Sequence, residues 1–313
     1  IITPTRELNN QKHRVFTYLS RGTGALVEIC QKETRGLPNC HVLCGTHGAL
    51  SRLLRGQQLS QVKTLIYDEA DFLFDNSDNS ATVSQLQSMM PAAQQLLFSA
   101  TYTDQVRSYI SRAIGAFSEI RIEKEEDLNL SNIEQYVIRC EHEQKHETVA
   151  DILKSVEMKC CLIFVNTKNY GTSLLEYLKK KGYTASIIGT GLVTDEVRDQ
   201  IIEKMRRGEI KVLITSNVLS RGFDLRTVSL VVNLDIPMMM VRKGVFQPDP
   251  TTYLHRIGRT GRYGRKGVAV NVVADRESRD ALLAIQRHFN SEINSVTIEG
   301  LAEAMVRVNV DYE

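Results

Sequence analysis

The stretch EVRDQIIEKMRRGEIKVLIT (196–215) contains a pattern that predicts the fold of this chain. Its first part places apolar side chains on a single helical stripe, at Val197, Ile201, Ile202 and Met205. Gly208 then interrupts the pattern, as a glycine at the C-terminal end of a helix commonly does. The apolar run Lys211–Thr215 follows, and its length and continuity are typical of a strand buried on both faces. The stretch therefore predicts a helix, a glycine stop and a buried strand.

Comparable apolar runs recur along the chain, and helical patterns separate them. The other predicted strands are residues 62–67, 95–98, 161–165, 230–234 and 268–273. A second predicted helix, 174–181, is closed by Gly182 in the same way. The alternation of strands with helices is typical of an α/β fold built on parallel sheets. Because domains commonly have about 100–200 residues, a chain of 313 residues is expected to form two of them.

The composition restricts the class of protein. The chain is 42% hydrophobic and 24% charged, which is ordinary for a globular protein and too apolar for a disordered one. No stretch approaches the roughly 20 apolar residues of a membrane span, and no secretory leader pattern is recognisable. The net charge is only +2, so any binding of nucleic acid would depend on individually placed residues. Six cysteines without paired CxxC motifs favour a reducing compartment over a zinc site.

A charged stretch near the middle of the chain marks the predicted domain boundary. Residues 123–127 are all charged and have no periodic apolar face. We therefore expect a first domain over 1–125, a linker over 126–132 and a second domain over 133–313. The chain starts without methionine and already within an apolar run, so the first domain is expected to begin partway through its fold.

Two polar motifs directly follow predicted strands. The motif Asp68-Glu69-Ala70-Asp71 follows strand 62–67, and Ser99-Ala100-Thr101 follows strand 95–98. Ligands of parallel α/β sheets bind beyond the carboxyl ends of the strands. Two acids at that position can hold Mg²⁺ through water and orient an attacking water molecule. The alternative interpretations are a solvated acidic turn for the first motif and a helix cap for the second.

The most specific signal is the run Tyr253 to Gly267. Between His255 and Lys266 it contains four arginines, one lysine and no acid. Arginine forks suit phosphate oxygens, and the interleaved glycines allow close approach of the backbone to a ligand. A solvated basic loop or a general nucleic-acid patch would not need that glycine spacing. The stretch 215–224 is compatible both with phosphate and ribose contacts and with a plain strand-to-helix turn.

The order of these motifs resembles the DEAD-box RNA helicases over essentially the whole chain. The matching stretches are Pro4–Leu8, Asp68–Asp71, Ser99–Thr101, Thr215–Asp224 and His255–Arg262. The resemblance implies two RecA-like parallel-sheet domains that bind ATP and Mg²⁺ in the cleft between them and RNA across both. It also implies an RNA-stimulated ATP hydrolase that remodels RNA duplexes or RNA–protein complexes.

The resemblance assigns expected roles to individual residues. Catalytic roles are expected for Asp68, Glu69, Arg259 and Arg262. Contacts with ATP are expected for Asp224, Arg259 and Arg262, and Mg²⁺ would be held through water by Asp68 and Glu69. Coupling between the domains is expected for Asp71, Ser99, Thr101, Arg198 and His255. RNA contacts are expected for Thr5, Arg6, Gly45, Thr46, Thr167, Thr215 and Arg221.

One family element is absent from these 313 residues. The glycine-rich phosphate-binding loop, which ends in Gly-Lys-Thr and cradles the phosphates of ATP, should lie upstream of Pro4. We therefore expect the first domain to lack its N-terminal part and this chain alone to be inactive. The alternative is a degenerate helicase that acts as a non-catalytic module binding RNA or a protein.

An insertion before the last motif gives a finer resemblance. Residues Met238–Thr252 are similar to the corresponding insertion of the mRNA-export helicases, which act at the nuclear pore. That resemblance implies a nucleoporin and an activator bound to an inositol polyphosphate as partners, and a location in cytoplasm and nucleus, at the pore. We expect a monomer. Met238-Met239-Met240 is interpreted as a loop packed on its own domain and not as a partner-binding patch.

Overall fold

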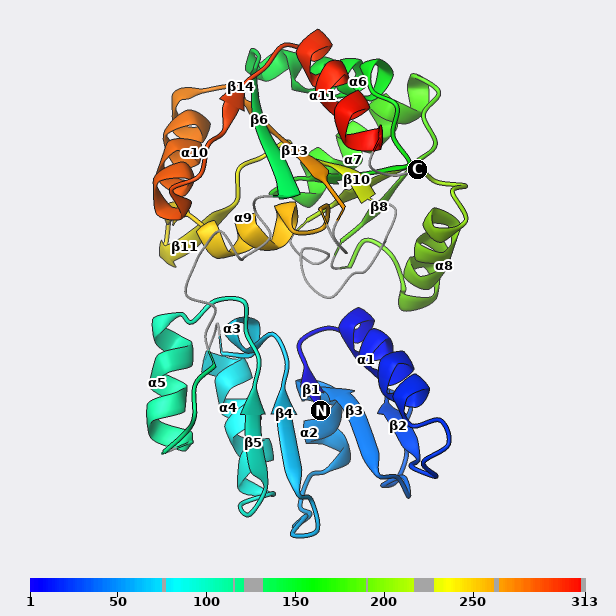
Figure 1. The fold of residues 1–313 in the computed structure, drawn as a ribbon, viewed down its shortest axis with the longest axis vertical. Coiled ribbons are helices and arrows are strands. Elements are labelled where there is room, and N and C mark those ends of the chain that lie inside the picture. Colours follow the sequence, from blue (N-terminus) through cyan, green and yellow to red (C-terminus); the bar gives the residue numbers. More distant parts are fainter. Residues whose placement is uncertain are drawn as a thin grey trace. The chain divides into compact units, whose positions relative to one another are not determined.

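A computed structural model describes residues 1–74, 77–114, 116–120, 132–189, 191–216, 228–261 and 265–310. Contacts divide the chain into unit 1 (Ile1–Ile120) and unit 2 (Arg121–Glu313), and each unit has its own sheet and core (Figure 1). The predicted domain limits and the linker at 126–132 stay predictions, because residues 121–131 lie outside the described residues. In the described parts of the chain, no helix combines the length and apolarity needed to cross a membrane.

Unit 1 is built on a five-stranded parallel sheet in the order β2-β3-β1-β4-β5. Its strands are β1 (Ile2–Thr3), β2 (Val27–Cys30), β3 (Val42–Thr46), β4 (Thr64–Tyr67) and β5 (Gln94–Leu97). Its helices are α1 (Arg6–Leu19), α2 (His47–Leu53), α3 (Ala70–Leu73), α4 (Ser77–Ser88) and α5 (Asp104–Ala113). Because the strands are parallel, the residues that follow them meet at one edge of the sheet.

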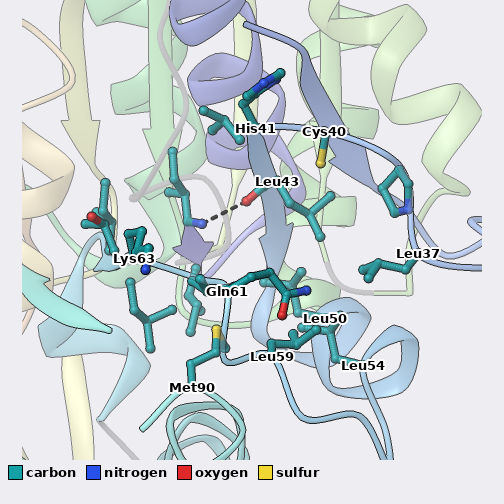
Figure 2. A pocket seen from close by; sticks show the side chains of 18 of the residues that line it. Leu37, Cys40, His41, Leu43, Leu50, Leu54, Leu59, Gln61, Lys63 and Met90 are labelled. Carbon is teal, nitrogen blue, oxygen red and sulfur yellow. Dashed lines mark hydrogen bonds between the residues drawn. The ribbon is translucent and has the colours of Figure 1, made fainter. Parts of the chain in front are cut away.

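The first strand of unit 1 is short and lies beside a cavity. Figure 1 shows the N-terminus within the sheet, next to β1. A cavity of about 700 Å³ extends between β3 and β4 at that end, and Figure 2 shows Leu43, Leu50, Leu59 and Met90 around it. The amino group of Ile1 donates a hydrogen bond to the carbonyl of Leu43 at 2.8 Å. Burial of this amino group lowers its pKa, because the charged form loses contact with water there.

Unit 2 contains a seven-stranded parallel sheet in the order β14-β6-β13-β10-β7-β9-β8. The strands are β6 (Ile133–Arg139), β7 (Cys160–Phe164), β8 (Ala185–Ile188), β9 (Val212–Thr215), β10 (Val228–Asn233), β13 (Gly267–Val273) and β14 (Asn294–Ser295). The helices are α6 (Lys145–Ser155), α7 (Lys168–Lys180), α8 (Asp195–Arg206), α9 (Pro250–Ile257), α10 (Arg276–Phe289) and α11 (Ile298–Val310), with a short 3₁₀ turn at His142–Gln144.

The predicted α/β fold with two parallel sheets is confirmed. Every residue of β7, β10 and β13 is buried, as their continuous apolar runs indicate. The predicted helix stop is also confirmed, because Gly208 follows α8 with a φ of 74°. The apolar stripe of α8 is narrower than predicted, since Ile202 and Met205 are buried whereas Val197 is 41% exposed. All six cysteines are free thiols.

The prediction that the methionine run packs on its own domain as a loop holds only for Met238. Residues Met238–Arg242 (β11) pair antiparallel with Val245–Pro248 (β12) to form a separate two-stranded hairpin. Only Met238 packs against the core, whereas Met240 is 62% and Phe246 57% exposed. Gly244 has a φ of 76°, which the turn between the two strands requires. The insertion is long enough to pair with itself, and this pairing carries its apolar side chains away from the sheet.

Candidate functional site

The acidic motif of unit 1 lies at the carboxyl end of β4. The N–H of Asp68 donates to the carbonyl of Ile2 at 3.0 Å, which ties the motif to β1. The Asp68 carboxylate lies 2.8 Å from the ammonium group of Lys12 in α1. Glu69 adopts a left-handed backbone conformation with a φ of 53°, which costs a residue other than glycine roughly 1–3 kcal/mol and is typical of functional sites. The two carboxylates therefore sit at a strained turn on the edge where ligands of such sheets bind.

A hydrogen-bonded network joins the acidic motif to the hydroxyl motif after β5. The hydroxyl of Thr101 donates to the Asp71 carboxylate at 2.8 Å, and the backbone N–H of Asp71 donates to the Ser99 hydroxyl at 3.0 Å. Ser99 in turn donates to the carbonyl of Thr101 at 2.6 Å. The helix-cap interpretation does not hold, because Thr103 caps α5. The structure thus brings together the three coupling residues predicted in unit 1.

The two carboxylates at this edge suit a divalent cation. Asp68 and Glu69 offer the hard oxygen ligands that Mg²⁺ prefers, and Mg²⁺ keeps several waters when it binds one or two carboxylates. Asp71 is less suited, because one of its oxygens accepts from Thr101 and the other from the N–H of Phe72 at 2.9 Å. The residues present therefore fit Mg²⁺ held by Asp68 and Glu69, with Lys12 as a competing positive charge.

The predicted RNA-contacting residues of unit 1 lie at the same edge of the sheet. Thr5 caps α1 by accepting from the N–H of Leu8 at 3.3 Å, and Arg6 is the first residue of that helix. Thr46 caps α2 by accepting from the N–H of Ala49 at 3.4 Å. Backbone N–H groups at helix N-termini favour anions such as phosphate.

Gly45 has a structural reason to be glycine. A Cβ atom at this position would lie 2.5 Å from Cγ of Leu50, which is itself buried. The absence of a side chain lets α2 pack closely against the end of β3. Its predicted contact with RNA stays a prediction.

In unit 2, helix α9 (Pro250–Ile257) leads into the predicted phosphate-binding run and contains its first residues. Asp249 caps the helix by accepting from the N–H of Thr252 at 2.8 Å, and Pro250 occupies the first helical position. His255 and Arg259 are 5% and 6% exposed. The Nε of Arg259 donates to the carbonyl of His255 at 3.0 Å. The two residues are therefore held by the end of the helix and not by a flexible loop.

Arg256 anchors α9 to the carboxyl ends of β7 and β10. Its guanidinium is fully buried, donates to the carbonyl of Asp235 at 2.7 Å and to the amide oxygen of Asn166 at 3.0 Å, and lies over the ring of Phe164. Burial lowers the pKa of Arg256 to about 9, against the opposing effect of Asp235. The group therefore keeps its charge near neutral pH.

The Asp235 carboxylate completes this cluster. It accepts from the ammonium group of Lys145 at 2.6 Å and from the N–H of Asn166 at 2.9 Å. Sequence reasoning did not single out Lys145, Asn166 or Asp235. A signal was present, because Asp235 directly follows the predicted strand 230–234, as Asp68 follows the predicted strand 62–67.

A layer of buried, hydrogen-bonded polar side chains supports α9. Asn233 donates to Asn271 at 2.9 Å, Asn271 donates to the hydroxyl of Tyr253 at 3.1 Å, and that hydroxyl donates to Gln135 at 2.8 Å. Because each of these buried groups has a partner, the layer fixes the orientation of the helix. Gly261 is needed for packing within unit 2, since its φ is 67° and a Cβ there would lie 2.6 Å from Ile133.

The remaining predicted residues of unit 2 differ in their surroundings. Thr167 is exposed and caps α7 by accepting from the N–H of Tyr170 at 3.3 Å. Thr215 is fully buried, and its hydroxyl donates to the carbonyl of Ser216 at 2.9 Å. Arg198 lies on α8 and is partly buried. Arg221, Asp224 and Arg262 lie outside the described residues.

Known proteins match both units. Residues 1–109 match the family model described as DEAD/DEAH box helicase, and residues 144–264 match that of the helicase conserved C-terminal domain. The structure of S. cerevisiae Dbp5 bound to RNA and ADP BeF3 matches with a TM-score of 0.88 at 33% identity, over 100% of this chain and 80% of that one. The chain belongs to the DEAD-box RNA helicases. Its predicted RecA-like fold is confirmed by this match.

Further DEAD-box relatives point to the same subgroup. ATP-dependent RNA helicase DBP5 of Debaryomyces hansenii is 39% identical over 297 residues, which are 93% of this chain and 59% of that protein. A variant of S. cerevisiae Dbp5 bound to Nup159, Gle1, IP6 and ADP matches with a TM-score of 0.64 at 30% identity, over 98% of this chain and 81% of that one. The chain spans between 54% and 65% of the length of the curated relatives it matches.

Proposed function

We propose that this chain is part of an ATP-dependent RNA helicase that couples RNA-stimulated ATP hydrolysis to the remodelling of RNA duplexes or RNA–protein complexes. The observation that carries the proposal is the network of Asp71, Ser99 and Thr101 beside the carboxylates of Asp68 and Glu69. It joins Asp71, in the same motif as the predicted hydrolytic residues, to the hydroxyl motif that follows the neighbouring strand. The match to Dbp5 bound to RNA and ADP BeF3 supports the same substrates.

The proposed chemistry follows from the carboxylates and the arginines. Asp68 and Glu69 would hold Mg²⁺ through its waters, and the ion would supply positive charge against the phosphates of ATP. The Glu69 carboxylate orients the attacking water and accepts its proton. Arg259 and Arg262 stabilise the negative charge that develops on the transferred phosphoryl group, and Asp224 contacts the ribose.

The proposed RNA contacts are independent of base sequence. Thr5, Arg6, Gly45 and Thr46 of unit 1 and Thr167, Thr215 and Arg221 of unit 2 would meet phosphates and sugars, which carry no direct sequence information. The residues Asp71, Ser99, Thr101, Arg198 and His255 would couple the state of the RNA site to hydrolysis.

Partners and location are proposed from the subgroup. A Dbp5 variant was solved with Nup159, Gle1 and IP6. By this likeness we propose that the protein acts in mRNA export with a nucleoporin and an activator bound to an inositol polyphosphate. It would then move between nucleus and cytoplasm and work at the nuclear pore. No observation favours the alternative of a degenerate, non-catalytic module.

The experiment compares two proteins that differ in one element. The first is this chain, which contains no Gly-Lys-Thr. The second is a chimera in which the segment of D. hansenii DBP5 that precedes the match is joined to Ile1. ATP hydrolysis is measured with and without single-stranded RNA, with Glu69→Gln as control. We expect background activity from the chain and RNA-stimulated activity from the chimera that Glu69→Gln abolishes. The proposal is contradicted if a folded chimera hydrolyses ATP at the same rate with and without RNA, or if its Glu69→Gln variant is still active.

A further inference from the structure

Lys12 is positioned against the acidic motif by the face of α1 that packs on the sheet. On that face Leu8 and Asn9 are buried, and His13 lies 3.3 Å from the carbonyl of Val27. Lys12 is one helical turn beyond Leu8, so its stem is carried toward the carboxyl edge of the sheet. Its side chain is only 33% exposed, and its ammonium group reaches the Asp68 carboxylate at 2.8 Å.

This ion pair sets a positive charge beside an oxygen that a cation would need. A divalent cation binds a carboxylate either directly or through its own waters, and both modes use the oxygen lone pairs. An ammonium group 2.8 Å from one Asp68 oxygen offsets the charge that attracts the cation, and it stands where the cation or its water would approach. Because the Asp68 side chain is only 16% exposed, solvent screens the repulsion between ammonium and metal less than it would on an open surface.

We propose that Lys12 is an internal counter-ion that competes with the divalent cation for Asp68. The inference rests on the proposed role of Asp68 as a metal ligand, and it adds a regulating residue to that site. Lys12 acts through Asp68 and touches no substrate, so it is a positioning residue. Binding of the cation releases Lys12, and a free Lys12 loosens the tie between α1 and the acidic motif.

The position of Lys12 also connects the cation to the predicted RNA contacts. Thr5 and Arg6 stand at the start of the same helix that carries Lys12. Any shift of α1 that draws Lys12 away from Asp68 raises the affinity of Asp68 for the cation. By linkage, binding of the cation favours the shifted position of α1 by the same free energy. The contact therefore offers a route by which RNA at the N-terminus of α1 raises the affinity of Asp68 for metal.

The test measures binding of Mn²⁺, a spectroscopic substitute for Mg²⁺, to the full chain by the electron paramagnetic resonance of free Mn²⁺. The variants are Lys12→Met, Lys12→Arg, Arg14→Met and Asp68→Asn. Arg14→Met is the matched control, because it removes a positive charge from an exposed position of the same helix. We expect Lys12→Met to lower the dissociation constant about tenfold, which is equivalent to about 1.4 kcal/mol. Lys12→Arg and Arg14→Met should bind as the unaltered chain does.

Each outcome separates this inference from the proposed function. If Lys12→Met binds Mn²⁺ no more tightly than Arg14→Met, or if Lys12→Arg gains as much as Lys12→Met, competition by the Lys12 charge is refuted. The double variant Lys12→Met/Asp68→Asn should show no such gain. If the single variant Asp68→Asn binds Mn²⁺ as tightly as the unaltered chain does, the role of Asp68 as a ligand fails and the inference fails with it. Should Lys12→Met not fold, as judged by circular dichroism, Lys12→Gln serves the same comparison.

Discussion

Removing the Asp235 carboxylate should destabilise unit 2 more than any surface charge does. In Asp235→Ala the ammonium group of Lys145, whose side chain is 9% exposed, loses a partner at 2.6 Å. The N–H of Asn166 also loses its acceptor at 2.9 Å. The fully buried Arg256 keeps its bond to the carbonyl of residue 235 but loses the nearby negative charge.

The magnitude follows from the burial of the two cations. Breaking a buried ion pair by removing one partner costs roughly 3–5 kcal/mol, because the remaining charge stays desolvated. Asp235 is itself 20% exposed, so water can reach part of the site and we expect the lower end, about 3 kcal/mol. The double variant Lys145→Met/Asp235→Ala should lose less than the sum of the single losses, since it leaves no unpaired ammonium group.

Urea unfolding of the full chain, followed by far-UV circular dichroism, measures the loss of unfolding free energy. Hydrogen exchange of peptides from β7 and β10 shows that the loss arises in unit 2. The control is Glu203→Ala, which removes exposed pairs with Arg206 and Arg207 at 3.5 and 3.4 Å. Such pairs contribute about 0–1 kcal/mol. The reasoning is refuted if Asp235→Ala costs no more than Glu203→Ala.

Three further predictions concern other parts of the chain. Joining Val-Leu-Val to Ile1 should raise the melting temperature of unit 1 above that of an Asp-Gly-Asp extension, because both extensions remove the buried amino group but only the apolar one fills the cavity beside β1 without burying charge; equal melting temperatures would contradict this. Burial and Lys145 lower the pKa of His146 below 6.5 in the folded chain. As the pH falls, the unfolded chain therefore binds a proton at this residue before the folded chain does, and the free energy of unfolding should decrease below pH 6.5. His146→Phe should reduce that fall in urea titrations between pH 7.5 and 5.5, and an unchanged fall would refute the assignment. Gly261→Ala should lower the free energy of unfolding by about 2 kcal/mol or more, because the new Cβ would collide with Ile133. Gly208→Ala should lower it by about 1 kcal/mol, because a Cβ at position 208 meets nothing within 4 Å. Equal losses in urea unfolding would contradict the packing argument.

The strands that could be predicted are those with continuous apolar runs. β7, β10 and β13 are buried on both faces, so every side chain in them is selected for burial. The edge strand β2 was missed because its first three residues are only partly covered and Glu28 is exposed. β1 was missed because two residues are too few to show a period.

The candidate site was predictable where it follows strand ends in order. Asp71, Ser99 and Thr101 come together because β4 and β5 are neighbours in a parallel sheet. The contacts of Lys12 with Asp68 and of Lys145 with Asp235 could not be predicted, because each depends on how a helix face packs across the sheet. The exposed β11–β12 hairpin was missed because methionine packs well in cores and its sequence gives no sign of exposure.

The most direct test of the account is the ratio of ATP hydrolysis with RNA to hydrolysis without RNA in the chimera that carries a phosphate-binding loop. Thr101→Val breaks the bond of 2.8 Å to Asp71 without a change of side-chain shape. If this network transmits the presence of RNA to the hydrolytic carboxylates, the ratio should fall toward one while hydrolysis without RNA is retained. A Thr101→Val chimera with an unchanged ratio would contradict the central claim.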